Sequence, residues 1–274
     1  MRLFDSHAHY DDARFEGETE RILSEVHASG VERITNIGSS LATSKSSVAL
    51  AQTHDFVYAA VGVHPSDAVK DMENADWLDK LENLTRSSDK VRAIGEIGLD
   101  YHYGKEDKEA QKDCFIAQMH LAEKRKLPVV IHDREAHEDT LAVLAQFPNV
   151  IGVVHSFSGS FEMARQVLKM GYYISVNGVL TFSNAKKIVD IVTRLDELAP
   201  DARERILLET DCPYLAPVPF RGKLNRSDYM LYTAEKAAEC LHISPDEFCE
   251  LTYRNACRFY GIPCPSASNE GVSA

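Results

Sequence analysis

The sequence lacks any long hydrophobic run, because no stretch approaches the roughly 18 uninterrupted apolar residues that a membrane-spanning helix needs. The segment 1–7 has no apolar targeting region and no cleavage site. The six cysteines form no C-x-x-C pair, so they give no sign of a zinc or dithiol motif. We therefore expect a cytoplasmic protein whose cysteines are reduced thiols, mostly in the core.

Positive charge is also scarce. The chain has 30 Lys and Arg against 42 Asp and Glu, a net charge of −12, which argues against a broad basic surface for long nucleic acids. Hydrophobic residues make up 44% and charged residues 26%, as in an ordinary globular protein. The residues 265–274 are small and polar. We expect one domain over residues 1–264 and a disordered tail over residues 265–274.

Short apolar, β-branched runs alternate with amphipathic stretches, which is typical of a parallel sheet whose strands are joined by helices. There are eight such runs, at residues 3–10, 32–39, 57–64, 92–100, 128–134, 151–157, 172–178 and 206–212. Right-handed crossovers close eight units into a (β/α)8 TIM barrel. A doubly wound open sheet uses the same units and is the structural alternative, but the count of eight favours the barrel.

Ionisable residues stand at the predicted carboxyl ends of several of these strands. They are His7, His9, His64, Glu96, Asp100, His132, His155 and Asp211. In a parallel barrel such residues meet at one face, where barrel enzymes have their active sites. His7 and His9 are two residues apart, so on a strand they point the same way and can share one cation.

Any one of these histidines, taken alone, is more often a structural residue than a ligand. The whole set, however, would leave several buried polar groups uncompensated in the absence of a metal. Imidazole suits zinc, whereas the carboxylates of Glu96 and Asp211 let magnesium or manganese compete. We expect two divalent metal ions (Mg, Mn or Zn) with Glu96 as the bridge between them. The expected metal ligands are His7, His9, Glu96, His132, His155 and Asp211.

Six short motifs are more specific than this pattern. They are FDSHAH at 4–9, GVHP at 62–65, GEIGLDY at 95–101, VIH at 130–132, HSFSG at 155–159 and ETDCPYL at 209–215. In this order they resemble the signature motifs of the TatD family of metal-dependent deoxyribonucleases, within the amidohydrolase-like superfamily, over residues 3 to about 260. The resemblance implies 3′-to-5′ exonuclease action on single-stranded DNA or RNA. It also implies one ion held by His7, His9, Glu96 and Asp211, and another held by Glu96, His132 and His155.

The chain departs from the family's usual motifs at three positions. Asp133 stands where cysteine is common, and its charge would either repel a phosphate or support a metal ligand from outside. Ser156 also replaces a cysteine, a change from which we expect little. Phe220 stands where histidine is common, while Arg221 and Asn225 of the same loop keep the family's pattern.

We expect Asp211 to orient the attacking water and take its proton, and Glu96 to be the second catalytic residue as the bridging ligand. Five residues are the expected substrate contacts: His64, Arg134, Phe157, Arg221 and Asn225. Among them the arginines would offset charge on the phosphoryl oxygens, and Phe157 would stack on a base.

Two other functions remain open. The first is an amidohydrolase-like esterase or lactonase that acts on a small molecule. Glu96 in the bridging position argues against the amide-cleaving branch of that superfamily, which often uses a carboxylated lysine. The second is a degenerate barrel that only binds, and the complete ligand set argues against it. We expect a monomer with nucleic acid as its substrate, without a membrane or an obligate protein partner.

Overall fold

The computed structural model describes residues 1–103 and 107–264, so the predicted tail lies outside the described residues. Eight parallel strands form one sheet in chain order from β1 to β8. They are β1 (Leu3–Ala8), β2 (Val31–Ile37), β3 (Val57–Val61), β4 (Val91–Asp100), β5 (Val129–Arg134), β6 (Gly152–Val154), β7 (Tyr173–Val176) and β8 (Ile206–Leu208). All eight predicted strands are therefore present.

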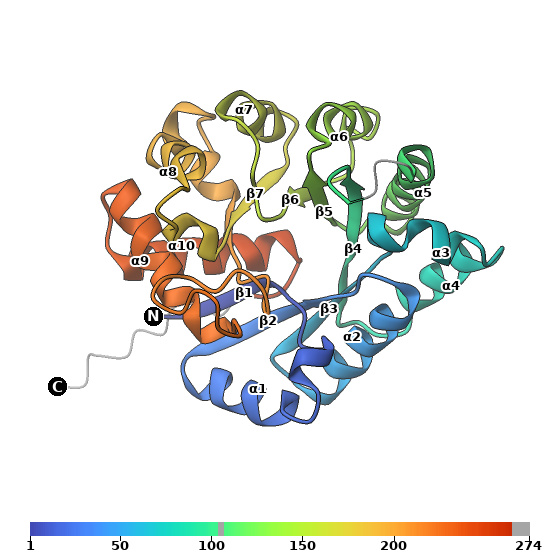
Figure 1. Cartoon of the computed structure of the whole chain (residues 1–274), viewed down its shortest axis with the longest axis horizontal. Helices are drawn as coiled ribbons and strands as arrows, with labels where there is room; N and C mark the ends of the chain where they lie inside the picture. The colour runs from blue at the N-terminus through green and yellow to red at the C-terminus, as the bar shows by residue number, and fades with distance from the viewer. Residues whose placement is uncertain (104–106, 265–274) are drawn as a thin grey trace.

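The sheet curls so that its first and last strands meet. Ala8 and Cys212 form a parallel bridge, the His9 N–H donates to the Cys212 carbonyl at 2.8 Å, and the Asp211 N–H donates to the His7 carbonyl at 2.9 Å. Figure 1 shows the helices arranged around this ring of strands. The predicted TIM barrel is confirmed, and the doubly wound open sheet is excluded.

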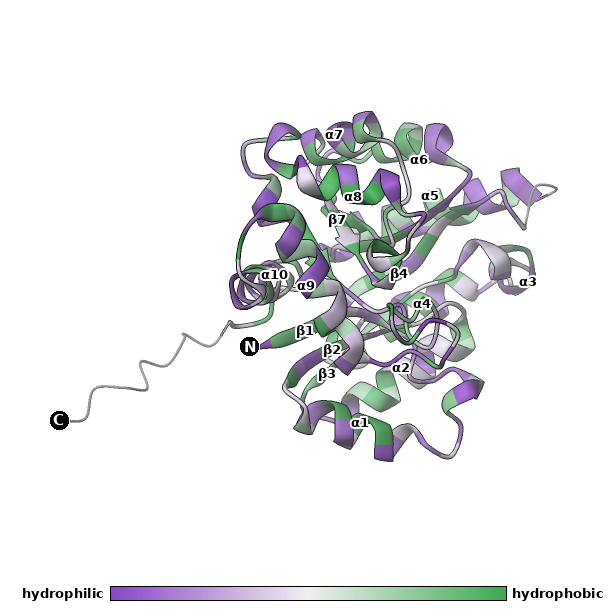
Figure 2. Cartoon of the chain, turned by 60° about the vertical axis from the view of Figure 1, so that its left-hand side comes forward, coloured by the Kyte–Doolittle hydropathy of each residue, from purple (hydrophilic) through white to green (hydrophobic). Residues whose placement is uncertain are grey.

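Helices connect the strands and cover the outside of the barrel. They are α1 (Thr19–Ala28), α2 (Leu41–Thr53), α3 (Ala68–Met72), α4 (Trp77–Leu84), α5 (Lys108–Arg125), α6 (His137–Leu144), α7 (Phe161–Lys169), α8 (Lys186–Thr193), α9 (Met230–Leu241) and α10 (Pro245–Phe259). In Figure 2 helix α8 carries both hydrophobic and hydrophilic residues, and its buried side is made by Ile188, Ile191 and Val192. Within the described residues, none of the helices has the length and apolar character required to cross a bilayer.

The barrel interior is filled by one side chain from each strand. These are Phe4, Ile37, Ala60, Ala93, Val130, Val153, Tyr173 and Leu207, and they pack together with residues of α10 and the turn after it. The Tyr260 hydroxyl donates to the Ser6 carbonyl at 2.6 Å, and its ring stacks on Phe4 with centroids 5.8 Å apart. Helix α10 therefore closes the amino end of the barrel, so the carboxyl end is the one left for a site.

The candidate ligands point toward the barrel axis for two different reasons, one in a regular strand and one in strands with an irregular register. On β5, His132 is two residues beyond the inward-facing Val130, as the period of a regular strand requires. On β1, His7 is three residues beyond Phe4, and on β4, Glu96 is three residues beyond Ala93. Both of these strands have an irregular register at the same place, between Asp5 and Ala8 and between Ile94 and Ile97. The irregularity re-aims the side chains of these two strands toward the axis.

Six of the eight predicted strands are too long at their carboxyl ends, whereas those predicted at 92–100 and 128–134 end where β4 and β5 end. His9, His64, His155 and Asp211 lie in the turns just after β1, β3, β6 and β8, not within the strands themselves. Asp211 has a φ of 57°, a left-handed conformation that ends a strand. The sequence continues to look extended there because apolar residues such as Cys212 remain buried in the turns.

Candidate metal centre

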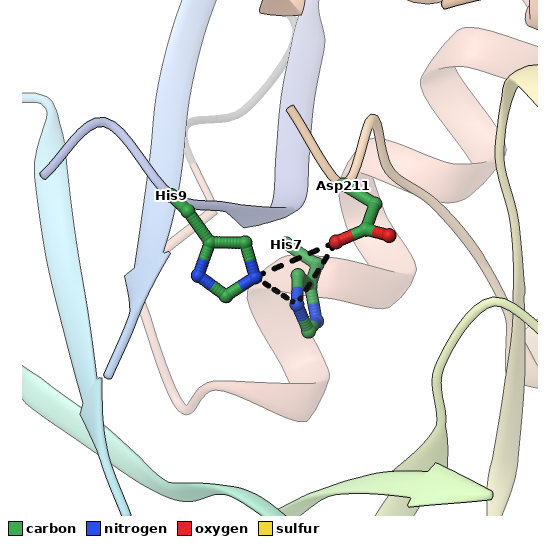
Figure 3. Close-up of side chains that lie close together, drawn as sticks. All are labelled: His7, His9 and Asp211. Atoms are coloured by element: carbon green, nitrogen blue, oxygen red, sulfur yellow. Dashed lines mark hydrogen bonds and ion pairs between the residues drawn. The ribbon is translucent and has the colours of Figure 1, made fainter. Parts of the chain in front are cut away.

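One group of potential ligand atoms comes from the first and the last strand of the barrel. His7 lies in β1 and His9 directly after it, and Asp211 lies in the turn after β8. The Nε2 atoms of the two histidines are 3.0 Å apart, and the Asp211 Oδ1 is 3.6 Å from His7 Nε2 and 3.4 Å from His9 Nε2. Figure 3 shows the three side chains pointing toward one another. Three potential ligands therefore converge on one point.

Glu96 lies between this group and two further histidines. Its Oε1 is 2.8 Å from His132 Nδ1 and 2.8 Å from His155 Nε2. Its Oε2 is 3.5 Å from His7 Nε2 and 3.8 Å from His9 Nε2. The two oxygens of this one buried carboxylate thus face two different sets of imidazole nitrogens.

The remaining ring nitrogens of three histidines face fixed acceptors, which sets their tautomers. His9 Nδ1 donates to the Ile37 carbonyl at 2.9 Å, and His132 Nε2 lies 3.2 Å from Asp100 Oδ2. His155 Nδ1 lies 3.5 Å from Glu209 Oε1. In each of these histidines the other ring nitrogen is the one that faces the centre of the site.

Two buried carboxylates that support the site were not expected from the sequence. Glu209 also accepts hydrogen bonds from Ser175 Oγ at 2.6 Å and the Ser156 N–H at 2.8 Å. Asp5 accepts from the Thr210 hydroxyl at 2.6 Å and the His7 N–H at 3.2 Å, so it fastens β1 to the segment after β8. Both acids lie within the matched motifs, FDSHAH and ETDCPYL, and this was the available signal.

The charges of the site depend on one another. Burial by itself would raise the pKa of Glu96, but His155 and His132, each 2.8 Å from its Oε1, hold that pKa well below its usual value. Burial by itself would lower the pKa of His9, but Asp211 and then Glu96 raise it to about 9. Burial likewise opposes the effect of Glu96 and Glu209, which raise the pKa of His155 well above its usual value. A cation at this site would therefore compete with protons for the nitrogens of His9 and His155.

This donor set fits divalent cations. Three groups each have their ligand atoms within 4.8 Å of one another: His7, His9 and Asp211; His7, Glu96 and His155; and His64, Glu96 and His132. Imidazole nitrogen and carboxylate oxygen are the ligands of zinc and related metals. Two imidazole nitrogens 3.0 Å apart, both aimed at a carboxylate, are better satisfied by a shared cation than by one shared proton.

A pocket of about 340 Å³ opens over these residues at the carboxyl end of the barrel. Two of the predicted substrate contacts, His64 and Arg134, line it. The Ser66 N–H donates to His64 Nδ1 at 3.1 Å, so the proton of His64 is on Nε2, which lies 3.6 Å from Glu96 Oε1. Burial, together with His132, lowers the pKa of His64 to about 3, so this ring is neutral.

The other three predicted substrate contacts are not among the described residues that line this pocket. Phe157 is buried, with 4% of its surface exposed. Asn225 is fully buried, and its amide group donates to the Thr210 and Tyr214 carbonyls at 3.0 and 2.7 Å, so it holds the loop after β8 in place. The Arg221 guanidinium lies 4.2 Å from the centre of the Phe182 ring. Phe157 and Asn225 are thus buried in the protein interior, away from the pocket, and the sequence did not reveal this burial.

The three departures from the family motifs also lie outside this pocket among the described residues. Asp133 accepts from the Thr140 hydroxyl at 3.1 Å and is 2.6 Å from His137 Nδ1, so it anchors the start of α6. These contacts of the Asp133 carboxylate are with α6, and they support neither of the two roles considered for its charge, repulsion of a phosphate and support of a metal ligand. Phe220 stacks on Tyr229 with ring centroids 4.1 Å apart.

Comparison with known proteins agrees with this site. The family model of TatD related DNases matches residues 4–261. An uncharacterized metal-dependent hydrolase, YabD of Bacillus subtilis, is 40% identical over 264 residues, which is 95% of this chain and 99% of the relative. YcfH of Escherichia coli K12, also an uncharacterized metal-dependent hydrolase, is 33% identical over 96% of this chain and 97% of its own length.

A solved structure shows the same architecture. The crystal structure of YjjV, a TatD homologue from Escherichia coli K12, superposes with a TM-score of 0.87 at 30% identity and covers 96% of this chain and 99% of that one. The barrel, the convergent ligands and the sequence relatives lead to one conclusion. The chain belongs to the TatD family of metal-dependent hydrolases.

Proposed function

We propose that this hydrolase removes nucleotides from the 3′ end of single-stranded DNA, with RNA as an alternative substrate, at a centre of two divalent cations. The observation that carries the proposal is the position of Glu96. One of its oxygens faces His7 and His9 at 3.5 and 3.8 Å, and the other faces His132 and His155 at 2.8 Å. A carboxylate placed in this way suits a bridge between two ions.

The expected division of ligands follows from this position. His7, His9 and Asp211 would hold one ion together with Glu96, and His132 and His155 would hold the other. Divalent cations supply two kinds of chemistry at such a centre: they polarise phosphoryl oxygens and lower the pKa of water toward neutrality.

The residues of the chain would supply orientation and proton transfer. Asp211 lines the pocket, and its neighbours His9 and His7 hold its pKa below the usual value against the effect of burial. It is therefore ionised and can accept the proton of the attacking water. The neutral Nε2–H of His64 and the guanidinium of Arg134 lie at the same pocket, where both can donate to the nonbridging oxygens of a phosphodiester.

A small phosphoester or lactone is the second candidate substrate, and the charge of the pocket favours it. Arg134 is the one arginine among the described lining residues, which also include the carboxylates of Asp11, Asp12 and Asp100. The pocket is nevertheless open and lined by polar groups, not closed and apolar, which favours the end of a longer molecule.

The first experiment uses a 5′-labelled single-stranded oligonucleotide with magnesium or manganese, and the products are resolved by length. We expect a ladder that shortens from the 3′ end, that is absent with a chelator and that is slowed by a 3′ block. The Glu96→Gln variant should lose at least about 100-fold in rate because it loses the charge between the two ligand sets. Its metal content, measured by mass spectrometry, should also fall.

Glu138→Gln makes the same chemical change at an exposed position of α6 and should behave as the wild type. Full activity of Glu96→Gln would remove Glu96 from the centre. A protein that carries its metals but leaves every oligonucleotide intact would contradict the nuclease proposal and direct the search to small phosphoesters and lactones.

A further inference from the structure

Few aromatic side chains are exposed in the part of the chain that the structure describes. The exposed ones are three tyrosines: Tyr103 with 76% of its surface exposed, Tyr214 with 45% and Tyr232 with 37%. Two of the three, Tyr103 and Tyr214, line the metal pocket, whereas Tyr232 lies on α9. Exposure of a large ring to water usually costs free energy. Two exposed rings at one pocket therefore indicate a surface that binds a ligand.

Tyr214 lies on the side of the pocket formed by β1 and β8. Its ring centroid is 6.4 Å from that of His9, with the rings at 83° to each other. Its hydroxyl donates to Asp12 Oδ2 at 3.0 Å, and the Arg14 guanidinium lies 3.9 Å from its ring centre. The ring is therefore fixed in orientation while nearly half of its surface stays open.

Tyr103 lies on the side formed by β4 and β5. Its N–H donates to Asp100 Oδ1 at 3.1 Å, and the other oxygen of Asp100 is 3.2 Å from His132 Nε2. The Arg134 guanidinium lies 4.8 Å from the Tyr103 ring centre. Each exposed tyrosine thus has an arginine close to its ring. Tyr214 lies next to the candidate ligand His9, and Tyr103 is linked to the candidate ligand His132 through Asp100.

The order of the strands places the two tyrosines opposite each other. Tyr214 follows β8 and Tyr103 follows β4, and these strands are four positions apart in an eight-stranded closed barrel. The metal ligands lie between them, with His9 and Asp211 toward Tyr214 and His132 toward Tyr103. A chain that passes over the ligands would meet one tyrosine before the centre and the other after it.

We infer that Tyr103 and Tyr214 are stacking platforms for two unpaired nucleobases, one on each side of the phosphodiester that is cleaved. The inference rests on the proposed function and adds to it the residues that select single strands. Every base has a π-face, so stacking on tyrosine tolerates any sequence, and bases held in a duplex are not free to stack in this way. Arg14 and Arg134, beside the rings, are placed to contact the neighbouring phosphates.

The test compares two substrates. One is a single-stranded oligonucleotide with normal bases, and the other is the same oligonucleotide with abasic residues at its last two 3′ positions. We expect Tyr103→Leu and Tyr214→Leu each to raise KM for the normal oligonucleotide about tenfold, and to leave KM for the abasic one unchanged. The metal content of the variants should equal that of the wild type.

Conservative and remote variants serve as controls. Tyr103→Phe and Tyr214→Phe keep the ring and should keep the KM of the wild type. Tyr232→Leu removes an exposed tyrosine that does not line the pocket, and should change neither substrate.

The outcomes separate the two proposals. If the wild type cleaves the oligonucleotide but the leucine variants affect normal and abasic substrates equally, or affect neither, the stacking role is wrong and the nuclease stands. If the wild type with bound metals cleaves no oligonucleotide, the nuclease proposal fails and the stacking role falls with it.

Discussion

Behind the histidines proposed as metal ligands lie residues that decide which ring nitrogen faces the site. Asp100 faces His132 Nε2 at 3.2 Å, which leaves His132 Nδ1 to face Glu96. The Asp100 carboxylate is itself fixed by the N–H groups of His102 and Tyr103 at 2.8 and 3.1 Å. Burial by itself would raise the pKa of Asp100, but His132 and these amides hold it at about 2. Asp100 is therefore ionised at neutral pH, where it acts as a hydrogen-bond acceptor.

Asp100→Asn should weaken the binding of one metal ion about 10- to 100-fold, because the amide no longer fixes the His132 tautomer with a charged acceptor. Isothermal titration of the metal-free protein with manganese or zinc measures this directly, without a nuclease assay. Asp113→Asn on the exposed face of α5 is the matched control and should bind as the wild type does. Unchanged affinity in Asp100→Asn would show that the contact is incidental.

The sequence was informative about residues that metal chemistry constrains, and less so about residues whose role depends on loop conformation. The six candidate ligands could be proposed from the sequence because ionisable groups at the ends of apolar strands are costly without a partner, and the structure brings their side chains together. Phe157 and Asn225 were predicted as substrate contacts, but their position away from the pocket could not be predicted, because residue type does not tell which side of a turn faces the pocket. The position of Tyr214 at the pocket was not predicted for the same reason.

At the level of elements, β4 is the strand on which the geometry of the site depends most. It carries Glu96 and Asp100, and its register with β5 is irregular between Ile94 and Ile97. Gly98 lies between the two acids with a φ of +136°. A Cβ built there would lie 2.0 Å from the His132 carbonyl oxygen, so the backbones of β4 and β5 approach too closely for any side chain.

Gly98→Ala should therefore cost about 3 kcal/mol or more of unfolding free energy, since both the positive φ and the clash oppose it. Gly171→Ala is a useful comparison, because Gly171 also has a positive φ, of +88°, but nothing lies within 4 Å of its Cβ position. That variant should lose only about 1 to 2 kcal/mol. Urea unfolding of both variants tests whether close approach, and not backbone angle alone, requires glycine at position 98.

The positions of the elements were predictable, but their ends and irregularities were not. Eight runs of β-branched residues suffice to count the strands. His7 and Glu96 each lie three residues beyond the inward-facing Phe4 and Ala93, where the register of β1 with β2 and of β4 with β5 is irregular. A strict period of two counted from Phe4 or Ala93 would have turned both side chains away from the axis, so these irregularities could not be predicted from the sequence pattern.

For the molecule as a whole, the acids gathered at the pocket are an electrostatic cost in the absence of cations. Asp11, Asp12, Glu96, Asp100 and Asp211 all line one pocket of a protein whose formal net charge is −12. Divalent cations would relieve this repulsion in the folded state, and the unfolded chain offers no such site.

Removal of metal should therefore lower the melting temperature. A ligand at 100 times its Kd stabilises the folded state by about 2.7 kcal/mol, which for a chain of this size corresponds to a decrease of roughly 5 to 10 °C on chelation. Differential scanning calorimetry with and without chelator measures the shift. In Glu96→Gln the shift should be much smaller, and an equal shift in both proteins would place the stabilising metal elsewhere.

The seam between β1 and β8 also has a consequence for synthesis of the protein. His7, Ala8 and His9 are translated well before Asp211 and Cys212, the residues that they meet at this seam. Helix α10, which closes the amino end of the barrel, follows later still. A chain terminated before residue 211 lacks Asp211, the bridge and α10, so its His7 and His9 cannot assemble the group that they form with Asp211.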